Sequence, residues 1–151
     1  MEMINYKLAI VLSLCLTAAL TEATDVKYCT KKAYDVKVKG VDISPYPITR
    51  GKETTFSISA TADAAISGGK LVIDVSYFGW SIHSEKHNLC DETSCPVSTG
   101  DFVVAHSQVL PGITPPGSYS LKMRMLDEDS HELTCITFDF SIGFISSVAD
   151  S

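Results

Sequence analysis

Hydrophobic and polar residues alternate along the chain in segments of seven to ten residues. In residues 118–126, for example, Tyr119, Leu121 and Met123 alternate with Ser120 and Lys122. A period of two is typical of a β-strand with one buried and one solvent-facing side. We therefore expect six such strands, at residues 34–43, 54–60, 70–77, 101–109, 118–126 and 133–142, and a seventh, shorter strand after Trp80.

Turn-forming residues separate these segments. Pro45 and Pro47 end the first, residues 127–130 form a polar hairpin turn, and the proline-rich residues 111–117 break any helix. At Gly40 the hydrophobic phase changes, which indicates a β-bulge or a switch between sheets. Since no segment has a sustained helical period, the chain is predicted to be an all-β, two-sheet sandwich of about seven strands.

The stretch from Gly69 to Pro96 stands out within this pattern. It begins with an apolar strand and continues into an aromatic turn at Phe78, Gly79 and Trp80. It ends in a short segment that Cys90 and Cys95 can close covalently. We interpret the stretch as one wall and the rim of a cavity for an apolar ligand.

The N-terminal residues have the features of a secretory signal peptide. Residues 8–20 form an apolar run of 13 residues after Lys7, with small residues at Thr21 and Ala23. The run is too short for a membrane anchor, which needs about 20 residues. We expect cleavage after Ala23, giving a signal peptide at 1–23, one domain at 24–145 and a loose tail at 146–151.

Charge and cysteine content narrow the function classes. The net charge is −6, and removal of residues 1–23 leaves −5, which argues against nucleic acid as a partner. Four cysteines remain after cleavage, and an even number in a secreted chain indicates two disulfides with three possible pairings. Because Cys90 and Cys95 are close in sequence, they are expected to pair, which leaves Cys29 with Cys135.

An ordered set of motifs carries a family resemblance. The set consists of Cys29, Val41-Asp42-Ile43-Ser44-Pro45-Tyr46-Pro47, Arg50-Gly51-Lys52, Cys90 to Pro96, the proline-rich loop and Cys135. It resembles the ML lipid-recognition family, which includes the Niemann–Pick type C2 sterol carrier and the phosphatidylglycerol/phosphatidylinositol transfer proteins, and it is most similar to the plant branch. The resemblance covers residues 25–142.

The resemblance implies an immunoglobulin-like sandwich whose sheets separate to hold a lipid. It also implies the pairs Cys29–Cys135 and Cys90–Cys95. The animal sterol carrier has a third disulfide in the loop after the first strand, whereas Tyr46 stands where its first cysteine would be. A sterol and a phospholipid both stay open as the ligand.

The inward-facing residues are the candidates for the ligand site. Alternation alone favours a packed core, because it indicates only burial, whereas the resemblance favours a cavity. The expected lining is Phe56, Ile58, Leu71, Ile73, Val75, Tyr77, Tyr119, Leu121, Met123, Met125, Phe138 and Phe140. Four apolar residues in predicted loops are expected to cap the core or to form the cavity mouth: Trp80, Ile82, Ile113 and Pro115.

Metal and catalytic sites are not expected. His83 and His87, followed by Cys90 and Cys95, could be taken for a zinc set, but the spacing is not a standard one and an oxidising compartment favours the disulfide. No ordered nucleophile, paired catalytic carboxylates or phosphate-binding glycine loop stands out. We therefore expect neither an enzyme nor a cofactor.

The sequence thus predicts a secreted or lumenal protein that carries a sterol or phospholipid between membranes or presents it to a partner. The alternative is an immunoglobulin-like interaction or signalling module with a filled core. We expect a monomer with transient membrane contact and a membrane protein as a possible acceptor of the lipid. The expected location is the secretory pathway: the extracellular space or apoplast, the vacuole or the endoplasmic reticulum lumen.

Overall fold

The computed structural model describes residues 22–143. These residues form nine strands and one short helix: β1 (Glu22–Thr24), β2 (Lys27–Tyr28), β3 (Val36–Ser44), β4 (Glu53–Ala62), β5 (Gly69–Tyr77), β6 (Trp80–Asn88), α2 (Leu89–Glu92), β7 (Gly100–Val109), β8 (Gly117–Asp127) and β9 (Glu132–Ile142). The expected tail at 146–151 lies outside the described residues. So does the expected signal peptide, except that Glu22 and Ala23 belong to β1.

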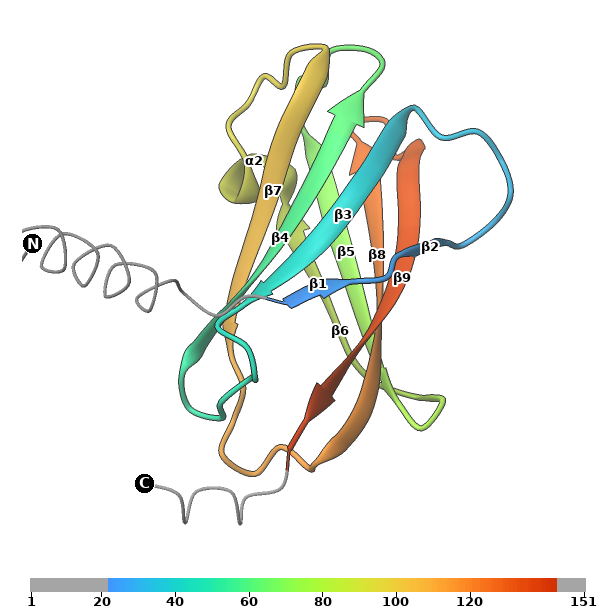
Figure 1. The fold of residues 1–151 in the computed structure, drawn as a ribbon. Helices are drawn as coiled ribbons and strands as arrows, with labels where there is room; N and C mark the ends of the chain where they lie inside the picture. The colour runs from blue at the N-terminus through green and yellow to red at the C-terminus, as the bar shows by residue number, and fades with distance from the viewer. Residues whose placement is uncertain (1–21, 144–151) are drawn as a thin grey trace, which may run out of the picture.

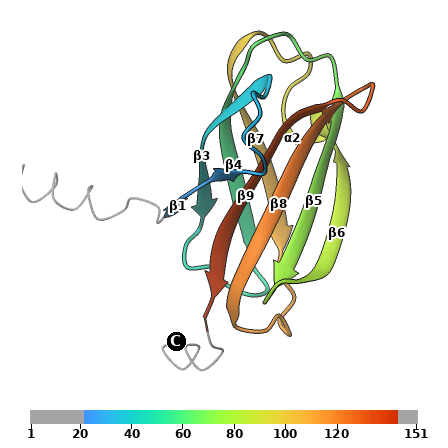
Figure 2. The same cartoon turned by 90° about the vertical axis from the view of Figure 1, so that its right-hand side faces the viewer.

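Two antiparallel sheets pack face to face (Figures 1 and 2). One has the order β1-β3-β4-β7, and the other has the order β2-β9-β8-β5-β6. This arrangement confirms the predicted all-β sandwich. The strands differ in number from the prediction because β1 and β2 are too short to show an alternating pattern.

The two long sides of the sandwich are closed in different ways. On one side the chain passes directly from β1 in the first sheet to β2 in the second, and the disulfide Cys29–Cys135 follows β2. On the other side the edge strands are β6 and β7, which belong to different sheets. The chain therefore joins the two sheets on both sides, by two residues between β1 and β2 on the first and by a longer segment through α2 on the second.

Along most strands, the sequence analysis predicted correctly which alternate side chains point between the sheets. Leu71 on β5 and Met123 and Met125 on β8 are completely buried between the sheets. The predicted bulge at Gly40 is also present, since the register of β3 against β4 shifts between Val38 and Gly40. The local alternation therefore identified the faces that pack.

Strand β6 is longer than the predicted short strand. Phe78 and Gly79 have φ angles of 50° and 80° and form a two-residue turn, so Tyr77 pairs with Trp80 at once. Positive φ at both central residues matches the twist of a hairpin. Trp80 and Ile82, which the sequence analysis placed in a loop, are consequently part of a strand.

The segment between Cys90 and Cys95 contains a helical turn that the periodicity did not predict. The Asn88 side chain accepts a hydrogen bond from the Cys90 backbone N–H at 2.9 Å and caps α2. The Thr93 N–H then donates to the Leu89 carbonyl, and Cys90 is bonded to Cys95. Both expected disulfides are thus present. Within residues 22–143, no helix is long and apolar enough to cross a membrane.

Candidate functional site

An apolar pocket of about 260 Å³ lies between the sheets at the end where β7 passes into β8. Both sheets contribute to its walls, with Phe56 on β4 facing Leu121 on β8 and Phe140 on β9. Backbone pairing fixes these positions, since Val75 pairs with Leu121, and Tyr119 with Phe140. The lining consists of Phe56, Val75, Ile82, His83, Gln108, Val109, Leu110, Pro111, Thr114, Tyr119, Leu121, Phe140 and Ile142.

Five of the twelve expected lining residues meet in this pocket: Phe56, Val75, Tyr119, Leu121 and Phe140. Six others are buried in the core outside it: Ile58, Leu71, Ile73, Met123, Met125 and Phe138. Tyr77 is half-buried near the mouth. Their contact with a ligand stays a prediction.

The boundary between core and pocket runs across β5 and β8. Ile73 and Met123 pair with each other and are almost completely buried, whereas Val75, two residues further along β5, is half-buried and lines the pocket. The sheets therefore pack tightly at one end and leave space at the other.

Side chains of Arg50, Tyr77 and Tyr119 hold the loop between β7 and β8 over the pocket by hydrogen bonds. The Tyr119 hydroxyl donates to the Pro115 carbonyl at 2.6 Å, and the Tyr77 hydroxyl donates to the Pro116 carbonyl at 2.8 Å. Arg50 Nε donates to the Thr114 carbonyl at 2.6 Å. Burial and the nearby Tyr77 raise the pKa of Tyr119, although Arg50 opposes them, so the hydroxyl remains a donor.

Large apolar side chains are exposed around this end of the sandwich. In Figure 1 the β5–β6 turn and the β7–β8 loop lie at the same lower end. Trp80 is 75% exposed and Ile113 is 91% exposed, and Pro115 is also exposed. Of the four residues expected at the mouth, only Ile82 lines the pocket. The missed lining residue Leu110 continues the inward alternation of β7 into the loop.

A second hollow of about 240 Å³ lies near the β8–β9 turn. Its lining includes Asp35, Asp127, Glu128 and Asp129. These carboxylates make it unsuitable for an apolar ligand. The pocket between the sheets is therefore the better candidate site.

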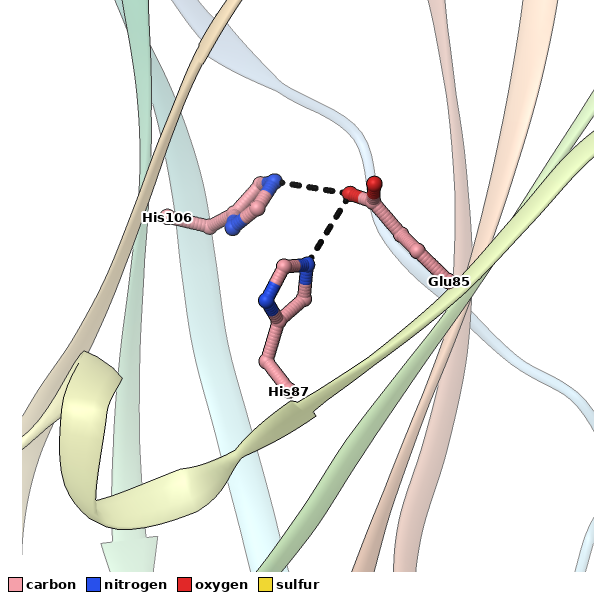
Figure 3. A group of neighbouring side chains, drawn as sticks. All are labelled: Glu85, His87 and His106. Carbon is pink, nitrogen blue, oxygen red and sulfur yellow. Dashed lines mark ion pairs between the residues drawn. The ribbon is translucent and has the colours of Figure 1, made fainter.

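Beside the pocket, three side chains from the two edge strands meet (Figure 3). Glu85 Oε1 on β6 lies 3.1 Å from Nε2 of His87 on the same strand and 3.1 Å from Nε2 of His106 on β7. Glu92 on α2 lies on the other side of His106, with Oε1 3.1 Å from Nδ1. The side chain of His106 is only 7% exposed.

The carboxyl of Glu85 is under opposing influences. Burial raises its pKa, but contacts with His83 and His87 and the proximity of His106 outweigh burial and hold the pKa below its usual value. Sequence reasoning missed Glu85 and His106 as a group. The alternation of Phe102 and Val104, continued along β7, was the available signal, because it turns His106 and Gln108 inward.

Comparisons with known proteins give a consistent picture. The ML domain family model matches residues 23–142. A phosphatidylglycerol/phosphatidylinositol transfer protein of Aspergillus oryzae is 29% identical, over 74% of this chain and 67% of its own. An MD-2-related lipid-recognition protein of Arabidopsis thaliana is 30% identical, over 72% of this chain and 71% of its own.

Two solved structures have a similar fold. A Niemann–Pick type C2 protein from the Japanese carpenter ant matches with a TM-score of 0.64 and 16% identity, over 78% of this chain and 98% of its own. Chicken MD-1, complexed with lipid IVa, matches with a TM-score of 0.53 and 15% identity, over 82% of this chain and 99% of its own. At these identities the likeness concerns the fold alone.

Proposed function

Because this chain belongs to the ML domain family, we propose that it binds one lipid in the pocket between its sheets and carries that lipid between membranes. The observation that supports this most directly is the apolar pocket bounded by Phe56, Leu121 and Phe140. Its mouth lies at the end where Trp80 and Ile113 are exposed, so a lipid can leave a bilayer there without crossing water.

Transfer by this route needs no chemical step. Each buried CH₂ group contributes about 0.8 kcal/mol relative to water, and an acyl chain is shielded from water both in a bilayer and in the pocket. Moving the chain between the two is therefore close to neutral in free energy and reversible. The protein acts as a carrier rather than an enzyme.

The pocket must widen to hold a whole lipid. Its volume of about 260 Å³ is below the roughly 300–1,000 Å³ typical of ligand pockets. Widening is easiest at the side bounded by β6 and β7, because on the other side β1 runs directly into β2 and β3 lies in contact with β9. The apolar part of the ligand then lies between the sheets.

The polar end of the ligand belongs at the rim. His83, Gln108 and Thr114 line the pocket there, and their polar groups suit a phospholipid headgroup or a sterol hydroxyl. The Aspergillus relative, named for phosphatidylglycerol and phosphatidylinositol, supports the phospholipid. The net charge of −6 suits transient rather than permanent contact with an anionic membrane.

Two disulfides place the protein in the secretory pathway, where thiols oxidise. Within that pathway we propose that it acts as a monomer in the vacuole, the endoplasmic reticulum lumen or the extracellular space. A membrane protein that accepts the lipid fits this role.

Organic extraction of the purified protein, followed by mass spectrometry, tests the proposal. We expect one sterol or phospholipid per chain, displaced when the protein is mixed with vesicles. A clean extract, together with no uptake of fluorescent phospholipid or sterol by the delipidated protein, would instead favour the interaction module with a filled core.

A further inference from the structure

Two histidines and two glutamates lie close together at the side of the sandwich where β6 and β7 form the sheet edges. Glu85 and His87 come from β6, the edge of one sheet, and His106 comes from β7, the edge of the other. Glu92 reaches them from α2, the helical turn that follows β6. Figure 3 shows Glu85 and His87 on one edge strand facing His106 on the other, so the group bridges the two sheets at these edges.

Each imidazole lies between the two carboxylates. Glu85 Oε1 is 3.1 Å from Nε2 of both rings, whereas Glu92 Oε1 is 3.1 Å from Nδ1 of His106 and 3.7 Å from Nδ1 of His87. A neutral imidazole has one N–H and one lone pair, so it can donate to only one of these carboxylates. With neutral rings, one carboxylate therefore faces a nitrogen lone pair of each ring. A positive charge between those nitrogens and that carboxylate would remove the repulsion.

The orientation of the groups indicates where that charge belongs. If His106 Nδ1 donates its proton to Glu92, the lone pair of Nε2 is left for Glu85, with the Gln108 side-chain oxygen 3.2 Å from the same nitrogen. Glu85 Oε1 and His87 Nε2 are both buried, and neither has a hydrogen-bond partner among the described residues, although they are 3.1 Å apart. Buried polar atoms without partners are costly, and these two converge on one point.

We propose that Glu85, His87 and His106 bind a zinc ion, with Glu92 orienting the imidazoles. Zinc takes imidazole nitrogen and carboxylate oxygen at about 2.0–2.2 Å, and tetrahedral ligands at that distance lie about 3.3 Å apart. The two 3.1 Å separations are close to this value. One zinc ion also balances the charges of the two glutamates.

Glu92 has the geometry of a carboxylate that supports metal-binding histidines. Such histidines usually donate their second N–H to a carboxylate, which fixes the tautomer and the ring orientation. On the opposite side, His83 Nε2 lies 3.0 Å from Glu85 Oε2 and fixes the other oxygen of that ligand. The expectation that no metal binds came from the set of His83, His87, Cys90 and Cys95, and the disulfide removes those cysteines.

Zinc at this position would clamp β6 to β7. His83 and Gln108, neighbours of the ligands along the two strands, line the lipid pocket. A bound ion would therefore oppose widening of the pocket and slow lipid entry. This consequence rests on the proposed lipid-carrying function, whereas the zinc site itself does not.

The site is tested on the purified protein, freed of metal with a chelator, by calorimetric titration with zinc chloride in the absence of lipid. We expect one ion per chain, and a visible absorption spectrum of tetrahedral type when Co²⁺ replaces zinc. Glu85→Gln and His87→Gln change partly exposed side chains, so they should leave the fold intact and weaken zinc binding by tenfold or more. Glu92→Gln should weaken it by about 10- to 100-fold.

His131→Ala is the matched control. His131 belongs to an exposed group with Asp127 and Asp129 on the β8–β9 turn, where Asp127 already accepts hydrogen bonds from two backbone N–H groups. Its loss should change zinc affinity by less than twofold. The proposal is overturned if the unmodified protein binds no zinc, or if binding depends on His131 and not on Glu85 and His87.

The clamp is tested separately by timing the uptake of fluorescent phospholipid. Zinc should slow uptake several-fold in the unmodified protein and leave Glu85→Gln unaffected. Equal rates with and without zinc, in a protein shown to bind both zinc and lipid, would overturn the clamp. Absence of lipid uptake under all conditions would count against the proposed function instead, because zinc binding is measured without lipid.

Discussion

Val75 lies where the packed core ends and the pocket begins. Replacement by Trp places an aromatic ring in space that a ligand would occupy. We expect the delipidated Val75→Trp variant to melt within a few degrees of the unmodified protein, since the pocket beside Val75 can accommodate the added ring, and to lose uptake of fluorescent lipid. Thermal melts and a binding titration on the same preparation measure both effects.

Ile73→Trp is the control, two residues earlier on the same face of β5. Ile73 is only 3% exposed and lies outside the pocket lining. Overpacking there should cost about 1–3 kcal/mol or more. If the two variants lost stability equally, or if Val75→Trp still took up lipid normally, Val75 would not line a ligand cavity.

At the scale of residues, the sequence predicted burial better than it predicted contact with the pocket. Alternation identified Val75 and Met123 as inward, and both are. It could not separate them, because the distance between the sheets at each point depends on tertiary packing. His106 was missed for a different reason. It follows Phe102 and Val104 at every second position of β7 and therefore points inward, but a polar residue was not expected there.

The β7–β8 loop is the element best placed to control access to the pocket. Tyr77→Phe combined with Tyr119→Phe removes two of its hydrogen bonds while keeping both rings. Each bond contributes about 1 kcal/mol, so the loop should open more often and lipid exchange between vesicles should accelerate. Exchange rates and amide hydrogen exchange of residues 110–117 measure this.

Tyr34→Phe is a suitable control for the loop variant. The Tyr34 hydroxyl is paired with Thr30 Oγ1 at 3.0 Å, and neither residue lines the pocket. This variant loses one hydrogen bond instead of two, so it should lose about half as much stability, without faster exchange. Unchanged exchange in the double variant would show that the loop does not limit passage of the lipid.

The two disulfides have different structural roles. Cys29–Cys135 joins residues 106 apart in sequence and ties the β1–β2 side to β9, whereas Cys90–Cys95 spans five residues around α2. On the chain-entropy model, a long loop is worth about 4.7 kcal/mol and the short one roughly 2 kcal/mol. The Cys29→Ala/Cys135→Ala variant should therefore melt well below Cys90→Ala/Cys95→Ala in thermal scans, and similar melting temperatures would contradict these roles.

At the scale of elements, the long alternating strands were predictable and the irregular ones were not. Residues 118–126 and 133–142 each fall within one strand, β8 and β9. Most of β6 shows no alternation of hydrophobic and polar residues, because it is an edge strand whose Ser81, Ser84 and Lys86 are polar and exposed. The helical turn α2 depends on the Asn88 cap and the nearby disulfide rather than on hydrophobic periodicity.

The molecule as a whole resembles a hinged pair of sheets. One long side is fixed by the short β1–β2 connection and by the contact of β3 with β9, and the other is bridged by Glu85, His87 and His106. The sequence implied a cavity through family resemblance, but not which side would open. The order of the strands within each sheet decides which side can open, and this order depends on pairings between segments that are distant in sequence.

We predict that lipid binding moves β6 away from β7 while the opposite side stays in place. The pocket is too small for a whole lipid, so we expect the extra volume to come from separating the sheets at the β6–β7 side, where they are joined only by the longer segment through α2. Spin labels on the exposed positions Lys86 of β6 and Ala105 of β7 should report a longer distance after loading with phospholipid. Labels at Asp42 of β3 and Ser141 of β9 should report no change, because those strands lie in contact near β1. If both distances grew equally, the sheets would separate as rigid bodies without a hinge, and if neither changed, the pocket would not widen between β6 and β7 and the prediction would be wrong.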